Sequence, residues 1–577
     1  MTTAVSPLPA GLRHESLEVG AAPVIRHFLE KLELPALFDR FLPRLRGRQR
    51  DVPTATVLCV LLSNLLLARQ PLYGMAAWTS DFVPEHLGLL PEQLALLNDD
   101  RFGHALDHFF RADRASLLTT VALTTVRVFE LVLKQLSQDT TTVTFSGEYA
   151  GQPPAEETDR PVRISRGYNK DHRPDLKQLL YNRTVTADGA VPIHCKIHDG
   201  NTTDSQVHER TWLALCEIVG GPDFLYVSDS KACEHEFMRL VAEKKGRFLT
   251  VMPRTRAEHK RFLAWVRDNE VKWEEVVRKN NPRGKNRPKV VYRGFEDSQG
   301  SEEGYRILWY HSSQKQERDF QARMKKVNKA RKRLQQLRPP GRGEAFKTEK
   351  AARKAVRRVL KEAKVRAWLK VVIEEVVQTE HVQVGRGRPG QDTLYKQVQL
   401  KSYKIRVEND EEALRRAARC DGLFPLMTND KKLNPKEALA KYKYQPYSEK
   451  RHQQLKSVFA VRPVWLKNVK RVESFLWLYH LVELVQALLE REVRRQMQQA
   501  STRRLPLWPE KRQCAKPTSE LVLNALRRHR RHRLIDQQGV EVYRFHDPVS
   551  DVAQTVLKLL GIDRSAFGLP QPVPGGA

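Results

Sequence analysis

The sequence contains few cysteines and no pair of them in a CxxC arrangement. Its six cysteines are scattered along the 577 residues, as Cys59, Cys195, Cys216, Cys233, Cys420 and Cys514. Zinc ribbons and disulfide frameworks both need cysteines at close, recurring spacings. The spacing argues against both classes and favours a reducing cytoplasmic setting.

Long apolar runs are also missing. The most apolar stretch, residues 52–69 (VPTATVLCVLLSNLLLAR), contains Thr, Ser and Asn and ends at Arg69. It is too short to cross a hydrocarbon layer about 30 Å thick, so a buried helix is the better interpretation. The N-terminus has no basic segment followed by an apolar run, so we expect neither a signal peptide nor a membrane partner.

Acidic residues are in deficit. The chain has 68 Asp and Glu against 100 Lys and Arg, a formal net charge of +32. This excess favours a polyanionic partner, with nucleic acid first and an anionic membrane surface second. A generically basic cytosolic protein is a weaker explanation, because the basic residues follow the whole chain and are not confined to one tail.

The periodicity of apolar residues predicts an α/β fold with an interruption. Helical spacing dominates residues 20–135, whereas strands and then alternating strands and helices follow from Asp139. Residues 321–377 are highly charged and helical, and Pro339-Pro340-Gly341 divides them into a helical hairpin. We therefore expect five segments: an all-α N-terminal domain (1–134), the first part of the core (135–254), an insertion with strands and a basic helical hairpin (255–410), the second part of the core (411–500), and a basic C-terminal segment (501–577).

Three acids stand in marked places. Asp139 interrupts a strand-forming segment (QDTTTVTF), Asp229 ends a short buried strand (DFLYVSD), and Glu449 lies near the start of a helix after the insertion. Two aspartates at neighbouring strand ends and a helical glutamate would form an all-oxygen site for two Mg²⁺ or Mn²⁺ ions. Such a pair, about 3.5–4 Å apart, supports in-line displacement at a phosphodiester. Surface solvation would explain any one of these acids alone, so the combination carries the hypothesis.

The predicted glutamate helix adds a cation. Glu449 and Lys456 are seven residues apart, which is two helical turns and therefore one face. A metal-binding carboxylate beside a phosphate-contacting lysine suits DNA strand cleavage. Without the two aspartates, an exposed Glu and Lys on a basic helix would be the better explanation.

At these residues the sequence resembles the DDE transposases of bacterial insertion sequences, in the insertion-sequence-four superfamily and its sixteen-thirty-four branch. The family's Tyr-x2-Arg-x3-Glu-x6-Lys signature aligns with Tyr442, Gln445, Glu449 and Lys456, so the spacing is kept but glutamine replaces arginine. Arg451 or Lys450 could take over the arginine's contact with DNA. Further likeness lies in DTTTVTF, GYNKDHRPDLKQLLYNRTV, HDGNTTDS and YVSDSKA, and it extends over roughly residues 20–500.

The resemblance implies a ribonuclease-H-like catalytic core in which Asp139, Asp229 and Glu449 bind the metal ions. It implies that Tyr442 and Lys456 position phosphates, that the N-terminal domain helps to bind DNA, and that a homodimer acts on the element's terminal inverted repeats and on target DNA. The expected location is the cytoplasm, with association to the bacterial nucleoid when the protein is bound to DNA.

Two alternatives stay open at this point. One is a catalytically inactive or repurposed DNA-binding relative, and the other is a helical scaffold or RNA-binding protein built around residues 315–380. A separate motif, GRGRPG at residues 385–390, matches the GxGxxG pattern of dinucleotide sites but is followed by a strand-like segment instead of a helix. A basic turn that touches DNA phosphates and a plain loop are comparably good interpretations of it.

Overall fold

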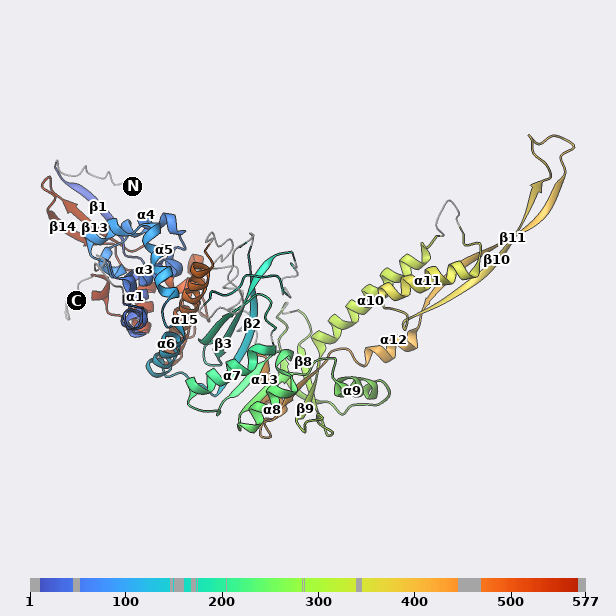
Figure 1. Cartoon of the computed structure of the whole chain (residues 1–577), viewed down its shortest axis with the longest axis horizontal. Coiled ribbons are helices and arrows are strands. Elements are labelled where there is room, and N and C mark those ends of the chain that lie inside the picture. Colours follow the sequence, from blue (N-terminus) through green and yellow to red (C-terminus); the bar gives the residue numbers. More distant parts are fainter. Residues whose placement is uncertain are drawn as a thin grey trace. The chain divides into compact units, whose positions relative to one another are not determined.

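The computed structural model describes residues 11–44, 52–145, 149, 160–167, 173, 175–203, 205–282, 284, 286–338, 345–444 and 468–568. The chain forms two compact units. Unit 1 comprises Met1–Thr250 and Ala440–Ala577, and unit 2 comprises Val251–Leu439 (Figure 1). The insertion expected at 255–410 therefore lies within unit 2, which extends beyond it on both sides.

Unit 1 is built on a mixed sheet. Its strands are β2 (Gln135–Phe145), β3 (Lys177–Thr186), β4 (Pro192–His198), β5 (Leu225–Ser228) and β6 (Arg247–Val251), in the order β4-β3-β2-β5-β6. The β2–β3 and β3–β4 pairs are antiparallel, whereas β2–β5 and β5–β6 are parallel. The predicted α/β character of this part is confirmed.

The β3–β4 turn contains two residues with positive φ angles, Gly189 (φ +86°) and Ala190 (φ +54°). Asp188, just before them, forms an ion pair with Arg491 of α15 (Val469–Gln499), at 2.6 Å. The aspartate therefore holds the turn against α15.

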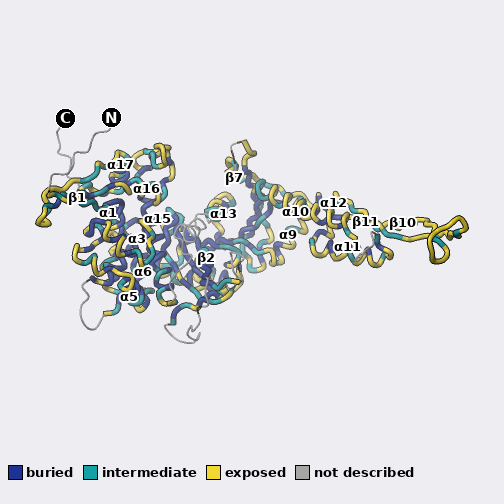
Figure 2. The backbone as a smooth tube through the Cα atoms, turned by 90° about the horizontal axis from the view of Figure 1, so that it is seen from above, coloured by how far each residue is buried: buried dark blue, intermediate teal, exposed yellow. Residues whose placement is uncertain are grey.

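Helix α15 is the central helix of unit 1. It contacts β4 of the sheet and also helices from both ends of the chain, and Figure 1 shows it between the sheet and the N-terminal helices. Most of its residues are buried, as Figure 2 also shows for this part of unit 1. It is the one described helix that is long and apolar enough to cross a membrane, yet 89% of its apolar window is buried inside the fold.

Helices surround the sheet and α15. The N-terminal helices include α1 (Ala22–Lys31), α2 (Leu34–Phe41), α3 (Thr54–Leu67), α4 (Met75–Ser80), α5 (Asp99–Phe110) and α6 (Arg114–Phe129). The remaining helices are α7 (Ser205–Val219), α8 (His235–Glu243), α16 (Ser519–Leu526) and α17 (Asp551–Leu560). Helix α3 is the apolar stretch identified in the sequence, and its burial confirms the predicted buried helix.

A second sheet joins the two ends of the chain. Strand β1 (Arg13–Glu18) pairs with β13 (Arg530–Ile535), which pairs with β14 (Glu541–His546). The expectation of an all-α N-terminal region is wrong for Arg13–Glu18. The basic C-terminal segment is folded over residues 501–568. Of the arginines in RRHRRHR, Arg530, Arg531 and Arg533 lie in β13, whereas Arg527 and Arg528 precede it.

One fully buried ion pair connects the sheet to α15. Arg183 of β3 and Glu483 of α15 are both 0% exposed, and the Arg183 Nη1 donates to Glu483 Oε1 at 2.5 Å. The Tyr181 hydroxyl donates to the other carboxylate oxygen of Glu483 at 3.4 Å. Two buried charges are tolerated here because each is neutralised by the other.

Unit 2 has its own antiparallel strands and a helical hairpin. Strands β7 (Glu274–Lys279), β8 (Val290–Asp297), β9 (Arg306–Ser312) and β12 (Leu423–Thr428) lie in the order β12-β9-β8-β7. Helices α9 (Ala257–Asp268), α12 (Glu411–Ala418) and α13 (Pro435–Tyr442) accompany them. The predicted basic hairpin is present as α10 (Ser313–Gln335) and α11 (Glu349–Ala363), whose core includes Val327, Leu334, Val356 and Val359.

A two-stranded ribbon extends from this hairpin. Strands β10 (Leu369–Gln383) and β11 (Tyr395–Asn409) pair with each other over fifteen residues each. Only the base of the ribbon, with Leu369, Val371, Ile373, Ile405 and Val407, packs against α10 and α11.

The Arg183–Glu483 pair gives a first prediction. Glu483→Leu leaves a buried guanidinium without its counter-charge, so we expect a loss of about 3–5 kcal/mol in the free energy of unfolding. The double substitution Arg183→Met with Glu483→Leu removes both charges and should recover most of that loss. Urea denaturation of the full chain measures both. Glu33→Gln is the control, because it disrupts an exposed pair with Arg127 and should shift the midpoint little; a double variant no more stable than Glu483→Leu would contradict the prediction.

Candidate metal and phosphodiester site

The parallel register of β2 and β5 brings the two predicted aspartates together. Gln135 pairs with Leu225, Leu136 with Tyr226, and Ser137 with Val227. Asp139 and Asp229 are each four residues beyond Gln135 and Leu225, so continuing the register places them level with each other. Neighbouring strands lie about 4.8 Å apart, and level residues of a parallel pair point to the same side of the sheet.

Backbone hydrogen bonds orient both carboxylates. The Thr140 N–H donates to Asp139 Oδ1 at 2.8 Å, and the Lys231 N–H donates to Asp229 Oδ1 at 2.9 Å. Asp229 also caps the short 3-10 helix Ser230–Ala232. Both aspartates are partly exposed, whereas the other residues of β2 are buried. Each carboxylate is therefore held by a backbone hydrogen bond in a residue that remains partly exposed.

A buried polar network lies on the opposite face of the same strands. The Ser228 hydroxyl donates to Gln138 Oε1 at 2.8 Å, and Gln138 Nε2 donates to Asn182 Oδ1 at 2.7 Å. Asn182 Nδ2 donates in turn to Thr211 Oγ1 of α7, also at 2.7 Å. Gln138 and Ser228 directly precede the two aspartates, so this network fixes β2 and β5 against each other at the level of the acids.

Arg183 lies beside Asp139, on the face of the sheet that carries the two aspartates. The two residues are cross-strand partners in the β2–β3 pair, and their side chains therefore share one side of the sheet. Burial alone would lower the pKa of Arg183, but the charge of Glu483, and to a smaller extent that of Asp139, raises it above its usual value. Arg183 is thus a permanent cation that Glu483 already engages, so it does not neutralise the aspartates by itself.

The third predicted ligand, Glu449, lies outside the described residues, but the chain on both sides of it is fixed. Gln135 Nε2 donates to the Lys441 carbonyl at 3.1 Å, and Gln135 is on the same side of β2 as Asp139. On the C-terminal side, α15 follows from Asn468 and contacts the same side through Glu483 and Arg183. Lys441, four residues before the segment 445–467, is therefore held on the face that carries the two aspartates, and α15, which follows the segment, reaches that face at Glu483.

The remaining predicted site residues fall in or beside that segment. Tyr442 is the last residue of α13. Gln445, Lys450, Arg451 and Lys456 lie outside the described residues, as does Glu449. Within the described ranges, no group of three or more His, Cys, Asp or Glu side chains is arranged to hold a metal ion. The described part of the site is thus a pair of carboxylates.

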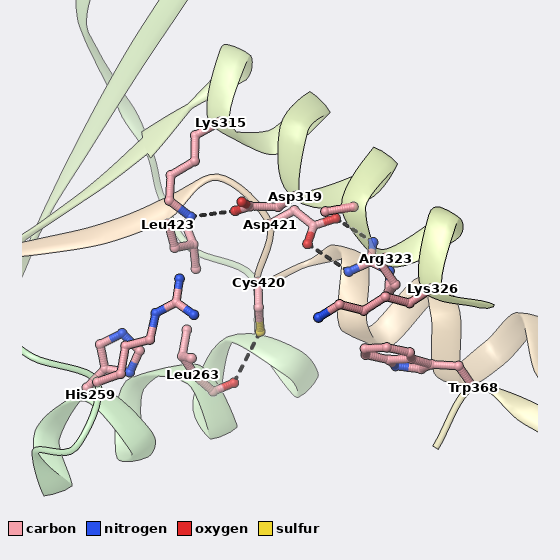
Figure 3. Close-up of a pocket in the computed structure, with 12 residues that line it drawn as sticks. His259, Leu263, Lys315, Asp319, Arg323, Lys326, Trp368, Cys420, Asp421 and Leu423 are labelled. Carbon is pink, nitrogen blue, oxygen red and sulfur yellow. Dashed lines mark hydrogen bonds and ion pairs between the residues drawn. The ribbon is translucent and has the colours of Figure 1, made fainter. Parts of the chain in front are cut away.

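A separate basic cavity lies in unit 2, with a volume of about 310 Å³ (Figure 3). In Figure 3, Lys315 points to Asp319 and Arg323 to Asp421, and the Arg323–Asp421 pair is buried. Its lining also includes Arg254 and Lys326, for which no ion pair is found in the described part of the chain. The two acids of the lining, Asp319 and Asp421, are each paired with a cation, so the four Lys and Arg residues of the lining outnumber its acids by two.

Sequence reasoning missed the residues that support the aspartates. Arg183 in YNRTVT and Glu483 in LVELVQALL are charged residues within otherwise buried elements, a signal that could have suggested a buried pair. Gln138 and Asn182 gave no comparable signal, because polar residues are common in strands with one solvated face.

Comparison with known proteins matches only part of this chain. A family model described as a domain of unknown function, DUF4277, matches residues 15–123, which run from β1 into α6. No curated protein matches the chain.

Two solved structures of transposases show partial likeness. The piggyBac transposase synaptic complex with hairpin DNA has 13% identity and a TM-score of 0.25, and the match covers 49% of this chain and 59% of that one. The Mos1 transposase paired-end complex with left transposon end has 11% identity and a TM-score of 0.14, over 38% of this chain and 64% of that one. Neither likeness spans two thirds of the matched chain, and at these scores neither identifies the fold or activity of this protein.

The polar network gives a second prediction. Asn182→Leu removes the acceptor of Gln138 and the donor to Thr211, and should lower the free energy of unfolding by about 1–3 kcal/mol. Urea denaturation with a buried-tryptophan fluorescence readout measures the change. Gln399→Leu, an exposed amide on β11, is the matched control and should stay within about 0.5 kcal/mol. If the two substitutions lowered the free energy of unfolding equally, the network would not stabilise the fold.

Proposed function

We propose that this protein is a DNA transposase of the DDE type, which cleaves DNA at element ends and transfers the freed strand into target DNA. The observation that supports it best is the level placement of Asp139 and Asp229 on adjacent parallel strands, both oriented by backbone hydrogen bonds and both accessible. The family resemblance of the sequence assigns the same two residues to the metal site.

Glu449 can reach the two aspartates. Lys441 is held at Gln135, and Asp139 lies four strand residues farther along β2, or about 13 Å. The eight residues from Lys441 to Glu449 cover about 12 Å as a helix and about 27 Å when fully extended. The tether therefore suits a third carboxylate at the site, and we propose that Glu449 supplies it.

The donor set fits hard divalent cations. Asp139, Asp229 and Glu449 would offer only carboxylate oxygens, which Mg²⁺ and Mn²⁺ prefer. Two such ions, when bound, activate a nucleophilic oxygen and stabilise the leaving oxygen of a phosphodiester. The chain's own residues fix the carboxylates: Thr140 and Lys231 through their N–H groups, and Gln138 and Ser228 through the network behind them.

The proposed reaction has two steps. Water attacks a phosphodiester and frees a 3′-hydroxyl, and this hydroxyl then attacks a phosphodiester of the target, so that no covalent enzyme intermediate forms. Lys456 and Tyr442 would position phosphates, and Lys450 or Arg451 would replace the arginine that Gln445 lacks. The net charge of +32 favours binding of double-stranded DNA. We also propose that the protein acts as a homodimer on the terminal inverted repeats of its element.

We further propose that the sheet of unit 1 is a ribonuclease-H-like core. It has an antiparallel β2–β3–β4 part and a parallel β2–β5–β6 part. Helices cover both faces: α7 contacts one through Thr211 and Asn182, and α15 contacts the other through Glu483 and Arg183. The second unit enters the chain between Asp229 and Glu449 and contains the insertion expected at 255–410.

The proposal predicts that Asp139→Asn and Asp229→Asn each lower metal-dependent cleavage at least about hundredfold, because a neutral amide is a much poorer ligand for divalent ions. The substrate is a duplex containing the DNA that flanks the protein's own reading frame, with Mg²⁺ or Mn²⁺ added. Asp223→Asn is the control, since this exposed acid precedes the opposite end of β5 and pairs only with Arg247 in the described structure. If Asp139→Asn cleaves as fast as the unaltered chain, the site is wrong. If no variant and no unaltered chain cleaves while all bind DNA, the inactive-relative alternative holds.

Glu449→Gln tests the third ligand separately. It should abolish cleavage to the same extent while leaving DNA affinity within about threefold, because one lost carboxylate changes the total charge little. Glu437→Gln on α13 is the control, as an acid on the approach to the same segment. Full cleavage by Glu449→Gln, with loss in Asp139→Asn, would mean that another residue completes the site.

A further inference from the structure

The tip of the β10–β11 ribbon exposes two arginines with no structural role. The Val384 N–H donates to the Leu394 carbonyl at 2.8 Å and closes the tip, which contains Gly385-Arg386-Gly387-Arg388-Pro389-Gly390. Residues 384–390 are all exposed, and Figure 2 shows the end of the ribbon as exposed. Neither Arg386 nor Arg388 forms an ion pair or a side-chain hydrogen bond within the described structure.

The backbone of the tip is narrow. Gly385 and Gly387 have φ angles of +109° and +146°, which residues other than glycine rarely adopt. A Cβ at either position would meet nothing within 4 Å, so close packing within the protein does not explain the glycines. Gln383 Nε2 donates to the Gly387 carbonyl at 3.1 Å and steadies the turn. Pro389 further restricts the backbone and removes one N–H donor.

The strands of the ribbon are nearly neutral. Residues 369–383 and 395–409 together contain five Lys or Arg and four Asp or Glu. Several of these charges are already paired, as in Lys401–Glu375 at 2.8 Å and Arg406–Glu408 at 2.9 Å. The tip segment Gly385–Gly390 adds two arginines for which no ion pair is found in the described structure, and the acid of the same connection, Asp392, follows two residues later. Lys396 and Lys404 are the strand cations that likewise have no ion pair among the described residues.

We propose that this tip inserts into the minor groove of A·T-rich duplex DNA. The minor groove is about 6 Å wide, which excludes a helix or a two-stranded ribbon but admits a single chain without side chains at its deepest point. The free tip bends at residues 384–387. If the chain extends within the groove, Arg386 and Arg388 would be about 6.7 Å apart, close to two base-pair steps of about 3.4 Å. Narrow A·T-rich grooves have an enhanced negative potential that attracts arginine. The N2 amino group of guanine projects into the groove and would block the same approach.

The inference rests on the proposed function only in taking duplex DNA as the partner, and it does not require cleavage. A tip that merely touches phosphates would bind every sequence equally and would accept lysine in place of arginine. A ribbon lying in the major groove would depend on the strand residues and not on Arg386 and Arg388. These three modes can be distinguished by base substitutions that change one groove at a time.

The experiment measures affinities of the full chain by fluorescence anisotropy at fixed salt, with three duplexes of equal length. One is A·T-rich, one is G·C-rich, and one has inosine in place of guanine; inosine·cytosine pairs keep the major-groove pattern of G·C but lack the N2 amino group in the minor groove. We expect the A·T and inosine·cytosine duplexes to bind about tenfold more tightly than the G·C duplex. Arg386→Ala with Arg388→Ala should remove this preference, and Arg386→Lys with Arg388→Lys should weaken it.

Lys396→Ala with Lys404→Ala is the matched control, because it removes two exposed charges from the ribbon strands and leaves the tip intact. It should retain the preference. Three results would overturn the proposal: equal binding of all duplexes, a preference that follows the major groove, or a preference unaffected by the two alanines at the tip. Asp139→Asn should retain the groove preference, so failure of cleavage and failure of this inference are separate outcomes.

Discussion

The parallel register between β2 and β5 is the constraint on which the candidate site depends. Asp139 and Asp229 are ninety residues apart in sequence, and only this register makes them level neighbours on one side of the sheet. A shift of one residue would move one of the acids to the opposite face, where α7 packs. The chain specifies the register with polar contacts as well as apolar ones, since Ser228 bonds to Gln138 immediately behind the acids.

Both faces of this sheet are held by buried polar groups, and the two sets have different consequences. On the α7 face, the hydrogen bonds from Ser228 through Gln138 and Asn182 to Thr211 lock neighbouring strands together. On the acids' face, Arg183 and Glu483 attach α15 to β3. This ion pair fixes the middle of α15, the helix that follows the segment containing Glu449.

Local patterns predicted much of this, because the signals were local. The change of period at Asp139 indicated strands, the short apolar run indicated β5, and Pro339-Pro340-Gly341 indicated the helical hairpin found as α10 and α11. The misplaced all-α N-terminus has a physical reason: β1 is a strand only because β13, more than five hundred residues later, supplies its partner. No short stretch of the sequence includes both strands of this pair. Arg183–Glu483 escaped notice for the same reason, since a buried charge can be understood only once its distant counter-charge is known.

The ribbon tip shows how an ordinary turn differs from a recognition element. A hairpin of two fifteen-residue strands needs only a short turn to reverse direction, whereas the connection here is eleven residues long, from Val384 to Leu394. Its glycines have open space around them, so close packing does not account for them. Arg386 and Arg388 form no ion pair within the described structure, although Asp392 lies in the same connection, and the two like charges repel each other. A polyanion that enters between them would relieve that repulsion, and the narrow glycine backbone leaves room for it to approach, which is why the tip is best understood as a surface shaped by its partner.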